Sequence, residues 1–181
     1  MFPFTARTKN DRLFMIRPGD VLDQERIIAN INAVAAEEIY LQTECFVLTP
    51  NWEDLLYDSL NPHKGQLLIL PIIDEQAIGH LRLHSGSYGE KDRHVGSIGL
   101  ALLAPYRGLG IGTVLLNCAL KWSRVAGFEK LEAYVIASNV RARRFFEKFG
   151  FVVEGIRQRQ LKIRGQYEDE LILARSTVSF Q

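Results

Sequence analysis

Three glycines at alternate positions, Gly108, Gly110 and Gly112, follow Arg107 in the stretch YRGLGIGTVLL, immediately before an apolar, helix-like pattern. The first turn of a helix carries N–H groups without intrahelical partners and a partial positive charge. Glycines lack a Cβ, so a bulky phosphate can reach those N–H groups. The stretch therefore predicts a phosphate-binding turn. For the glycines alone, a tight strand-to-helix turn without a ligand is the alternative.

Two familiar phosphate loops do not fit these residues. A P-loop requires GxxxxGK[ST], and no lysine follows the glycines here. A Rossmann fingerprint requires GxGxxG, but Leu115 stands three residues past the last glycine, and no acidic residue is clearly placed about 20 positions on. The phosphate compound must therefore be identified from other parts of the chain.

The glycine turn needs a strand before it and a helix after it, and the sequence predicts both. The stretch His94–Ala104 reads as a long strand, and Thr113–Ala126 reads as a helix with a buried apolar stripe and Gly127 just past its end. Residues 130–137 form the next expected strand, and a second helix runs from Ser138 or Asn139 to Gly150.

The remaining elements follow from hydrophobic spacing and turn residues. We expect a strand over Leu13–Asp20, a helix over Val21–Leu41 with Asp20 as N-cap, and a hairpin of residues 65–73 with Ala77–His84. A short helix is expected over residues 50–62, with Asn51 as N-cap and Asn61-Pro62 as its end, and two closing strands turn at Arg164-Gly165. This order of elements predicts one α/β domain with a mixed sheet.

The composition is that of an ordinary globular protein. The 181 residues are 47% hydrophobic and 24% charged with a net charge of +1, so no overall attraction to nucleic acid or membrane is indicated. Cys45 and Cys118 lie far apart, which disfavours a disulfide scaffold or zinc ribbon and fits a reducing cytoplasm. We see no signal peptide and no membrane-spanning run.

Two ordered motifs carry a family resemblance. The spacing Arg107-x-x-Gly110-x-Gly112 resembles the [RQ]xxGx[GA] pyrophosphate loop of the GNAT superfamily of N-acetyltransferases. The stretch NVRARRFFEKFGF is similar to the NxxAxxxYexxGF segment of that family. The closing stretch EGIRQRQLKIRGQYEDELILA resembles the last strands of its RimL-like and amino-acid-acetylating branches, so the resemblance covers residues 76–174.

The resemblance implies a fold and a co-substrate. The expected fold is a single-domain α/β GNAT fold over residues 1–181, with a mixed, mostly antiparallel sheet and helices on both faces. Acetyl-CoA is expected between two splayed parallel strands that end near Leu102 and Ala137. The implied cofactor-binding residues are Leu100, Leu102, Arg107, Gly108, Leu109, Gly110, Ile111, Gly112, Thr113, Asn139 and Phe146. An anion gains about 0.3–2 kcal/mol at a helix end, whereas micromolar affinity needs about 8 kcal/mol, so the strand must contribute to binding.

The usual proton carriers of the family are absent. The stretch HVGSIGLAL has no glutamate, with Ser97 near that position, and Phe146 stands where many members have a tyrosine. His94 is the remaining base candidate and Tyr134 a candidate donor; an exposed strand-end histidine and a core tyrosine are the alternatives. Because an α-amine (pKa about 7.7–8.0) loses its proton more easily than a lysine (about 10.4), a weak base favours a low-pKa amine as acceptor.

Other roles are weaker. His80 and His84 share a strand face but are too far apart for an easy joint metal site, so no metal is expected. The basic stretches RARRFFEK and RQRQLKIR are interpreted mainly as solvated faces. The predicted function is acetyl transfer to a small-molecule or peptide amine in a cytoplasmic protein, and the edge strands offer a surface for a homodimer. The alternatives are a CoA-binding sensor without catalysis and, less favoured at a net charge of +1, a nucleic-acid-binding domain.

Overall fold

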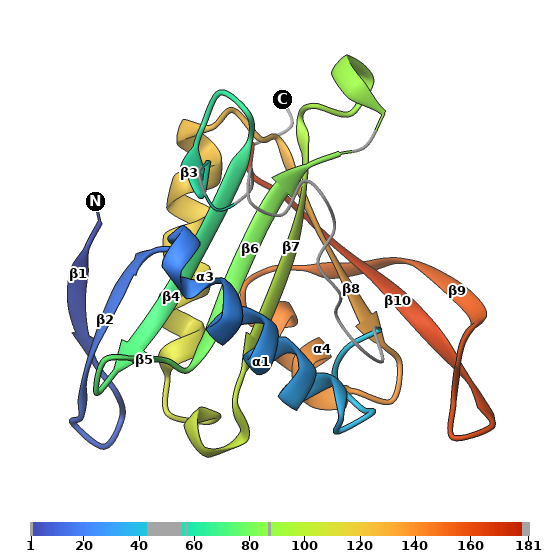
Figure 1. Cartoon of the computed structure of the whole chain (residues 1–181). Helices are drawn as coiled ribbons and strands as arrows, with labels where there is room; N and C mark the ends of the chain where they lie inside the picture. Colours follow the sequence, from blue (N-terminus) through green and yellow to red (C-terminus); the bar gives the residue numbers. More distant parts are fainter. Residues whose placement is uncertain (1, 43–55, 57, 87, 179–181) are drawn as a thin grey trace.

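The computed structural model describes residues 2–42, 56, 58–86 and 88–178. Within these residues, ten strands form one sheet in the order β1-β2-β4-β6-β7-β8-β10-β9, and β3 and β5 pair with β4 (Figure 1). The strands are β1 (Phe4–Arg7), β2 (Leu13–Pro18), β3 (Leu60–Asn61), β4 (Gln66–Ile73), β5 (Gln76–Ala77), β6 (Gly79–Ser85), β7 (Val95–Leu102), β8 (Lys130–Ile136), β9 (Val152–Ile163) and β10 (Gln166–Ser176). Only β7 and β8 pair in parallel among the described strands.

Helices cover both faces of this sheet, as expected. On one face, α1 (Gln24–Ala35) packs Ile27 and Ile31 against Leu68 and Leu70 of β4. On the other face lie α3 (Ile111–Val125) and α4 (Val140–Glu147), whose buried residues join a larger cluster (Figure 1). That cluster includes Leu67, Ile69, Leu81, Leu83, Ile98, Ile111, Leu115, Leu116, Trp122, Leu131, Phe146 and Phe151. The α/β fold with a mixed, mostly antiparallel sheet is therefore confirmed.

The continuous apolar run of β4 follows from this layering. Successive side chains of a strand point to opposite faces. Residues 67 to 73 of β4 are all buried, because the odd-numbered positions face α3 and the even-numbered positions face α1. A strand covered on both faces reads as an uninterrupted hydrophobic segment rather than as an alternation.

The start of the first helix is fixed by two aspartates. Asp20 accepts the N–H of Leu22, and Asp23 accepts the N–H of Asp20, which completes a capping box around a short 3-10 turn. The Asp23 carboxylate is almost fully buried and receives both Nη atoms of Arg17 at 2.6 and 2.7 Å. Burial alone would raise the pKa of Asp23. The hydrogen bonds from Arg17 and from the Asp20 backbone outweigh this effect, so the pKa lies below its usual value.

Other predicted boundaries are also confirmed. Asn139 caps α4 by accepting the N–H of Ala142 at 3.0 Å, and Gly127 follows α3 in the left-handed region at φ 81°. The turn between β9 and β10 places Arg164 and Gly165 at φ 50° and 80°. A positive φ at both central residues is typical of a two-residue hairpin turn.

Three expectations need correction or lie outside the described residues. The first helix ends at Ala35 rather than Leu41, because Glu38 turns the chain at φ 54°. The strand β1 was not predicted, because its alternation extends over only 4 residues. The helix expected over 50–62 falls mainly on residues that are not described, although Leu60–Asn61 belong to β3. No described helix is long and apolar enough to cross a membrane.

The junction of β7 and β8 is the feature that creates the site. Their parallel pairing joins Val95, Gly96 and Ser97 to residues 130–132 and then stops. Beyond Ser97 the two strands diverge, so β7 has a free edge from Ile98 to Leu102 on its β8 side, within the described part of the chain.

Candidate functional site

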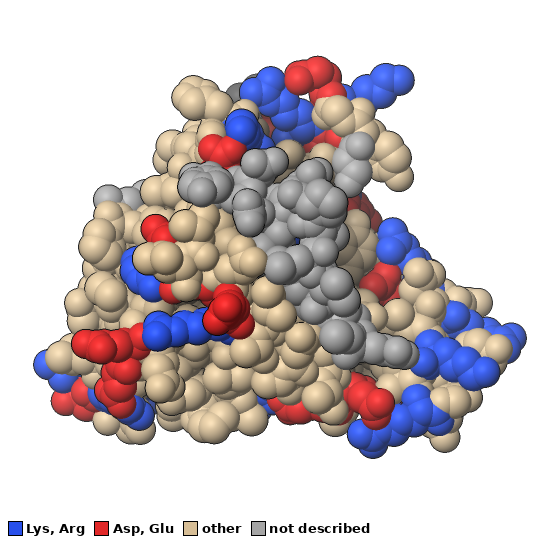
Figure 2. Space-filling model, in the orientation of Figure 1, with Lys and Arg blue, Asp and Glu red and all other residues tan. Residues whose placement is uncertain are grey.

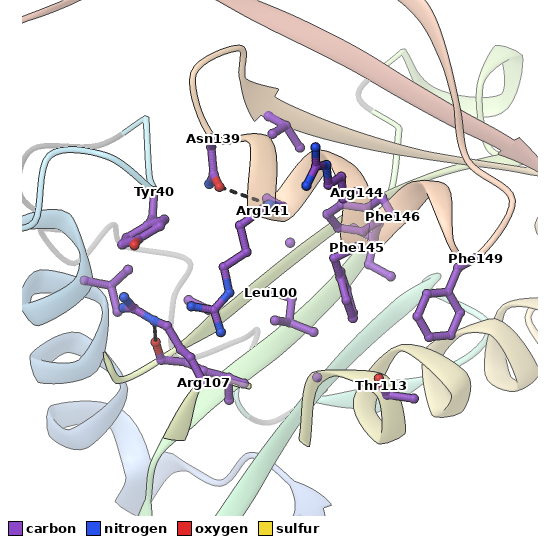
Figure 3. Close-up of a pocket in the computed structure, with 18 of the residues that line it drawn as sticks. Tyr40, Leu100, Arg107, Thr113, Asn139, Arg141, Arg144, Phe145, Phe146 and Phe149 are labelled. Atoms are coloured by element: carbon purple, nitrogen blue, oxygen red, sulfur yellow. Dashed lines mark hydrogen bonds between the residues drawn. The ribbon is translucent and has the colours of Figure 1, made fainter. Parts of the chain in front are cut away.

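A cleft of about 620 Å³ opens where β7 and β8 diverge (Figure 3). Its walls come from the end of β7, the glycine turn before α3, the middle of β8, the start of α4 and the segment after α1. The sequence-predicted residues among its lining are Leu100, Leu102, Arg107, Gly108, Gly110, Gly112, Thr113, Tyr134, Asn139 and Phe146. The structure thus brings together residues that lie up to 46 positions apart, from Leu100 to Phe146.

The glycine turn forms one end of the cleft. Gly108 and Gly110 have φ of 80° and 89°, a left-handed conformation that favours glycine, and Gly110 is the N-cap of α3. Leu109 and Ile111 do not line the cleft with their side chains: Leu109 packs against the core and Ile111 is buried in it. Any contact of these two residues with a ligand must therefore use the backbone. A helix N-terminus with bare glycines suits an anionic group.

Arg107 is already engaged within the protein. Its Nη atoms donate to both carboxylate oxygens of Glu37 at 2.7 and 2.5 Å, and its Nε donates to the carbonyl of Leu102 at 2.7 Å. The guanidinium also stacks 4.4 Å from the centre of the Tyr40 ring. The hydrogen bonds to Glu37 raise the pKa of Arg107, and the same contact lowers the pKa of Glu37. Arg107 therefore ties the glycine turn to the end of α1.

Other cations are available at the cleft. Lys9, Arg141, Arg144 and Lys148 line it, and a Cβ at Gly108 would lie 3.5 Å from an Nη atom of Arg141 (Figure 3). Lys9 belongs to the β1–β2 turn, whose backbone N–H bonds to Leu109 at 2.9 Å. Arg141 and Arg144 are exposed, which agrees with the interpretation of the α4 arginines as solvated, and they also line the open cleft.

The remaining basic residues do face away. Arg143 pairs with Glu147 at 2.8 Å on the outer side of α4. Basic side chains of the β9–β10 hairpin gather at the edge of the molecule (Figure 2), where β9 is exposed along most of its length. For these residues the solvated-face interpretation agrees with their exposure.

Asn139 and Phe146 stand on the α4 wall. The Oδ1 atom of Asn139 is occupied by its capping bond, which leaves its Nδ2 donors for other contacts. Phe146 is buried and packs edge-on against Phe145 and Phe151 at ring distances of 5.4 and 5.2 Å. These residues give the deep end of the cleft an apolar lining.

Tyr134 begins a chain of hydrogen bonds that leads from the cleft to the surface. Its hydroxyl donates to Glu132 at 2.9 Å, Glu132 pairs with Lys130 at 2.8 Å, and Lys130 pairs with the half-exposed Glu154 at 2.6 Å. Burial and the Glu132 carboxylate raise the pKa of Tyr134. Burial favours the neutral form of Glu132, but the bonds from Lys130 and Tyr134 lower its pKa overall. A protonated phenol therefore faces an ionised carboxylate.

His94 lies apart from this cleft. It is exposed at the entry of β7, roughly 20 Å along the strand from Leu100 at about 3.3 Å per residue, and it is not among the described residues that line the cleft. The structure therefore gives no support to His94 as the base. The reason is that the cleft opens at the far end of β7, beyond the parallel pairing.

The face of the sheet below α1 carries further polar residues. Glu170 is buried on β10, where it pairs with Arg157 at 2.9 Å and accepts from Gln42 at 3.2 Å. On β6, His80 is partly buried with a fully buried Nδ1, and burial and the nearby Arg82 lower its pKa to about 4; burial also lowers the pKa of His84. Among the described residues, no group of three or more His, Cys, Asp or Glu side chains is placed to hold a metal ion.

Sequence reasoning missed Lys9, Glu37 and Glu132. Lys9 and Glu37 come from the first 75 residues, where no motif was found. Lys9 lines the cleft from a turn, and Glu37 holds Arg107 from the segment after α1. Glu132 carried one available signal: it stands two positions before Tyr134, so the two residues share a strand face.

Comparisons with known proteins agree with this geometry. Residues 33–151 match the model of the acetyltransferase (GNAT) family. The L-amino acid N-acetyltransferase AaaT of Escherichia coli is 24% identical over 149 residues, which cover 78% of this chain and 90% of that protein. N-alpha-acetyltransferase 50 of Danio rerio is 33% identical over 90 residues, which cover 49% of this chain and 53% of that protein.

The fold is also found in solved structures. The structure of yncA from Salmonella typhimurium with its cofactor acetyl-CoA superposes with a TM-score of 0.82 at 16% identity, over 93% of this chain and 96% of that one.

Proposed function

Because the chain belongs to the acetyltransferase (GNAT) family, we propose that it transfers an acetyl group from acetyl-CoA to a primary amine. The observation that carries the proposal is the cleft itself: a free strand edge, a glycine turn at a helix N-terminus and the start of α4 meet in one cavity. The glycines fit the pyrophosphate, since at Gly108 and Gly110 the backbone is bare and left-handed. The bound acetyl-CoA in the yncA structure supports the same assignment.

The parts of the cleft divide the binding task. We assign the pyrophosphate to the backbone N–H groups of residues 108–113, with Lys9 and Arg141 as nearby cations. The pantetheine arm would run along the free edge of β7 at Leu100, as a short surrogate strand. Leu102 has its carbonyl bonded to Arg107, so its N–H is the group we assign to the ligand. Asn139 Nδ2 and Phe146 would meet the thiol end.

The proton relay is assigned to Tyr134 and Glu132. In the reaction the amine nitrogen forms a bond to the thioester carbon, the carbon–sulfur bond breaks, and the amine loses a proton. Tyr134 Oη would accept that proton as its own hydroxyl proton passes to Glu132, which its ionised state allows. A backbone N–H of the free β7 edge would stabilise the developing oxyanion. The thiolate leaves toward the open end of the cleft and takes a proton from water.

The acceptor lies on the face below α1 in this scheme. Tyr40, Leu41 and Gln42 line the cleft on that side. A small-molecule amine or a protein N-terminus are both acceptor classes of relatives, as the names of the two similar proteins state.

A thermal-shift experiment with acetyl-CoA, CoA and ATP tests the binding step. At a hundred times its dissociation constant, a ligand stabilises the fold by about 2.7 kcal/mol, which raises the melting midpoint of a chain this long by roughly 5–11 °C. We expect that shift with acetyl-CoA and CoA but not with ATP. An absence of any shift with both CoA compounds would contradict the proposal.

Turnover then separates an enzyme from a binding protein. Release of free CoA thiol in the presence of a panel of primary amines should exceed the release without amine. Binding of acetyl-CoA with no amine-dependent release across the panel would instead favour a CoA-binding sensor of the same fold.

A further inference from the structure

Arg82 lies in the middle of the sheet, on the face below α1. It is on β6, with Leu68 of β4 directly across on one side and Gly99 of β7 on the other. Paired residues of neighbouring strands share a face, and Leu68 packs against the α1 cluster. His80 and His84 flank Arg82 two positions away on the same face. Arg82 therefore belongs to a central strand of the sheet, on the face that α1 covers, and not to an edge strand.

This arginine has no anionic partner among residues 2–42, 56, 58–86 and 88–178. Its Nε is fully buried without a hydrogen-bond partner, and so is Nδ1 of His80 beside it. The arginines around it differ: Arg17 pairs with Asp23, Arg107 with Glu37, and Arg157 with Glu170. Burial lowers the pKa of Arg82, and no carboxylate of the described residues raises it again. The residue is partly buried, and a cation drawn out of water without an anionic partner is costly in a folded protein.

The acidic groups nearest on this face are already used. Glu132 is held by Lys130 and Tyr134, and Glu170 by Arg157 and Gln42. Neither carboxylate bonds to Arg82. Among the described residues, no carboxylate is left to pair with this guanidinium, which makes an anionic group of a bound molecule a candidate partner.

Open space lies next to Arg82 on the cleft side. Gly99 lines the cleft, and a Cβ built on it would meet no atom within 4 Å. Any larger residue would place a side chain there, between Arg82 on β6 and the diverging β8. Gly99 leaves this space, on the strand next to Arg82, free of a side chain of its own.

We propose that the amine acceptor carries a carboxylate that Arg82 binds, so that the acceptor is a free amino acid. This inference rests on the proposed acetyl transfer. A guanidinium can form two parallel hydrogen bonds to one carboxylate, so arginine is well suited to bind this group. Arg82 lies directly across from Gly99, which lines the cleft beside Leu100, where the pantetheine arm is assigned. A carboxylate distinguishes a free amino acid from a peptide N-terminus, which has an amide in this place.

The test compares each acid with its own amide. Acetyl transfer is measured on a panel of L-amino acids and β-alanine, each beside its primary amide, with the wild type, Arg82→Met and the surface control Arg124→Met. The ratio of kcat/KM for acid over amide is compared between variants, so the amine pKa of each compound cancels. We expect this ratio to fall about 10- to 100-fold in Arg82→Met, as for loss of a charged hydrogen bond, and to stay constant in Arg124→Met.

The melting midpoint of Arg82→Met gives a second readout that needs no activity. Removing an unpaired buried charge should leave the midpoint unchanged or higher, with the Kd for acetyl-CoA unaltered. A lower midpoint, or failure of the variant to fold, would show an internal partner and overturn the proposal; so would transfer to amides or peptides at an unchanged ratio. Absence of transfer to every amine, in contrast, would overturn the proposed function itself. Arg82→Lys, which keeps the charge without the two parallel hydrogen bonds, should show an intermediate ratio.

Discussion

At the scale of single residues, most of the residues predicted to bind the cofactor line the cleft, whereas of the two proton-carrier candidates only Tyr134 does. The glycines and Asn139 could be recognised because a bare backbone before a helix and a cap leave local patterns. The relay of Tyr134 and Glu132 depends on which face of β8 meets the cleft, and a spacing of two residues alone does not show this. His94 was selected for its residue type, although it lies at the wrong end of β7.

Replacing Tyr134 by phenylalanine tests the relay. The change removes the hydroxyl and keeps the ring under Arg157, which lies 5.0 Å from the ring centre. We expect kcat to fall by about 100- to 10,000-fold, the usual contribution of a positioned acid or base, with the Kd for acetyl-CoA unchanged. Tyr88→Phe is the matched control, because Tyr88 is 84% exposed. A Tyr134→Phe enzyme with normal kcat would remove Tyr134 from the mechanism.

At the scale of elements, the glycine turn was readable from the sequence and its anchors were not. The turn itself follows from three glycines before an apolar helix pattern. Its attachment to Glu37 and to the backbone of Lys9 brings together segments about 70 and 100 residues away, and no local rule predicts such contacts. The same limit explains why α1 is shorter than expected, since its end is set by contacts of Glu37 and Glu38 with distant arginines.

Two glycine-to-alanine variants separate backbone strain from ligand binding. Gly110 and Gly127 have similar φ of 89° and 81°, one before α3 at the cleft and one after α3 in open space. Alanine should cost about 1–2 kcal/mol of unfolding free energy at either site, because both positions are left-handed. Only Gly110→Ala should also raise the Kd for acetyl-CoA, by about tenfold or more. Equal affinities in the two variants would argue against a pyrophosphate at this turn.

At the scale of the whole molecule, the mixed sheet with helices on both faces was predicted, whereas the order of its strands was not. The apolar run of β4, the alternation of β6 and the helix stripe of α3 are each long enough to read. The polar residues beneath α1 are a different case. Arg82 looks like an ordinary outward-facing position of β6 until the register with Leu68 and Gly99 shows which face it occupies.

Acid unfolding of the whole chain should report the Arg17–Asp23 pair. The folded pKa of Asp23 is lowered, so its contribution to stability is complete above the unfolded pKa of about 3.9 and is lost as the pH falls through the folded pKa. Asp23→Asn should cost about 3 kcal/mol of unfolding free energy at pH 7, and its difference from the wild type should shrink below about pH 4. Asp11→Asn is the control, as its side chain is 81% exposed. A constant difference from pH 7 to pH 2 would contradict this assignment.

The short parallel pairing of β7 with β8 also divides the sheet mechanically. On one side, β1, β2, β4, β6 and β7 are joined by antiparallel ladders; on the other, β8, β10 and β9 are joined in the same way (Figure 1). The ladder between these halves ends at Ser97, so few main-chain bonds hold them together. In native-state hydrogen exchange, we expect the amides of the β7–β8 pairing to be less protected than those of the antiparallel ladders on either side. They should exchange through a local opening that needs less free energy than global unfolding. We therefore expect the cleft that is proposed to admit acetyl-CoA to coincide with the line along which the fold opens first.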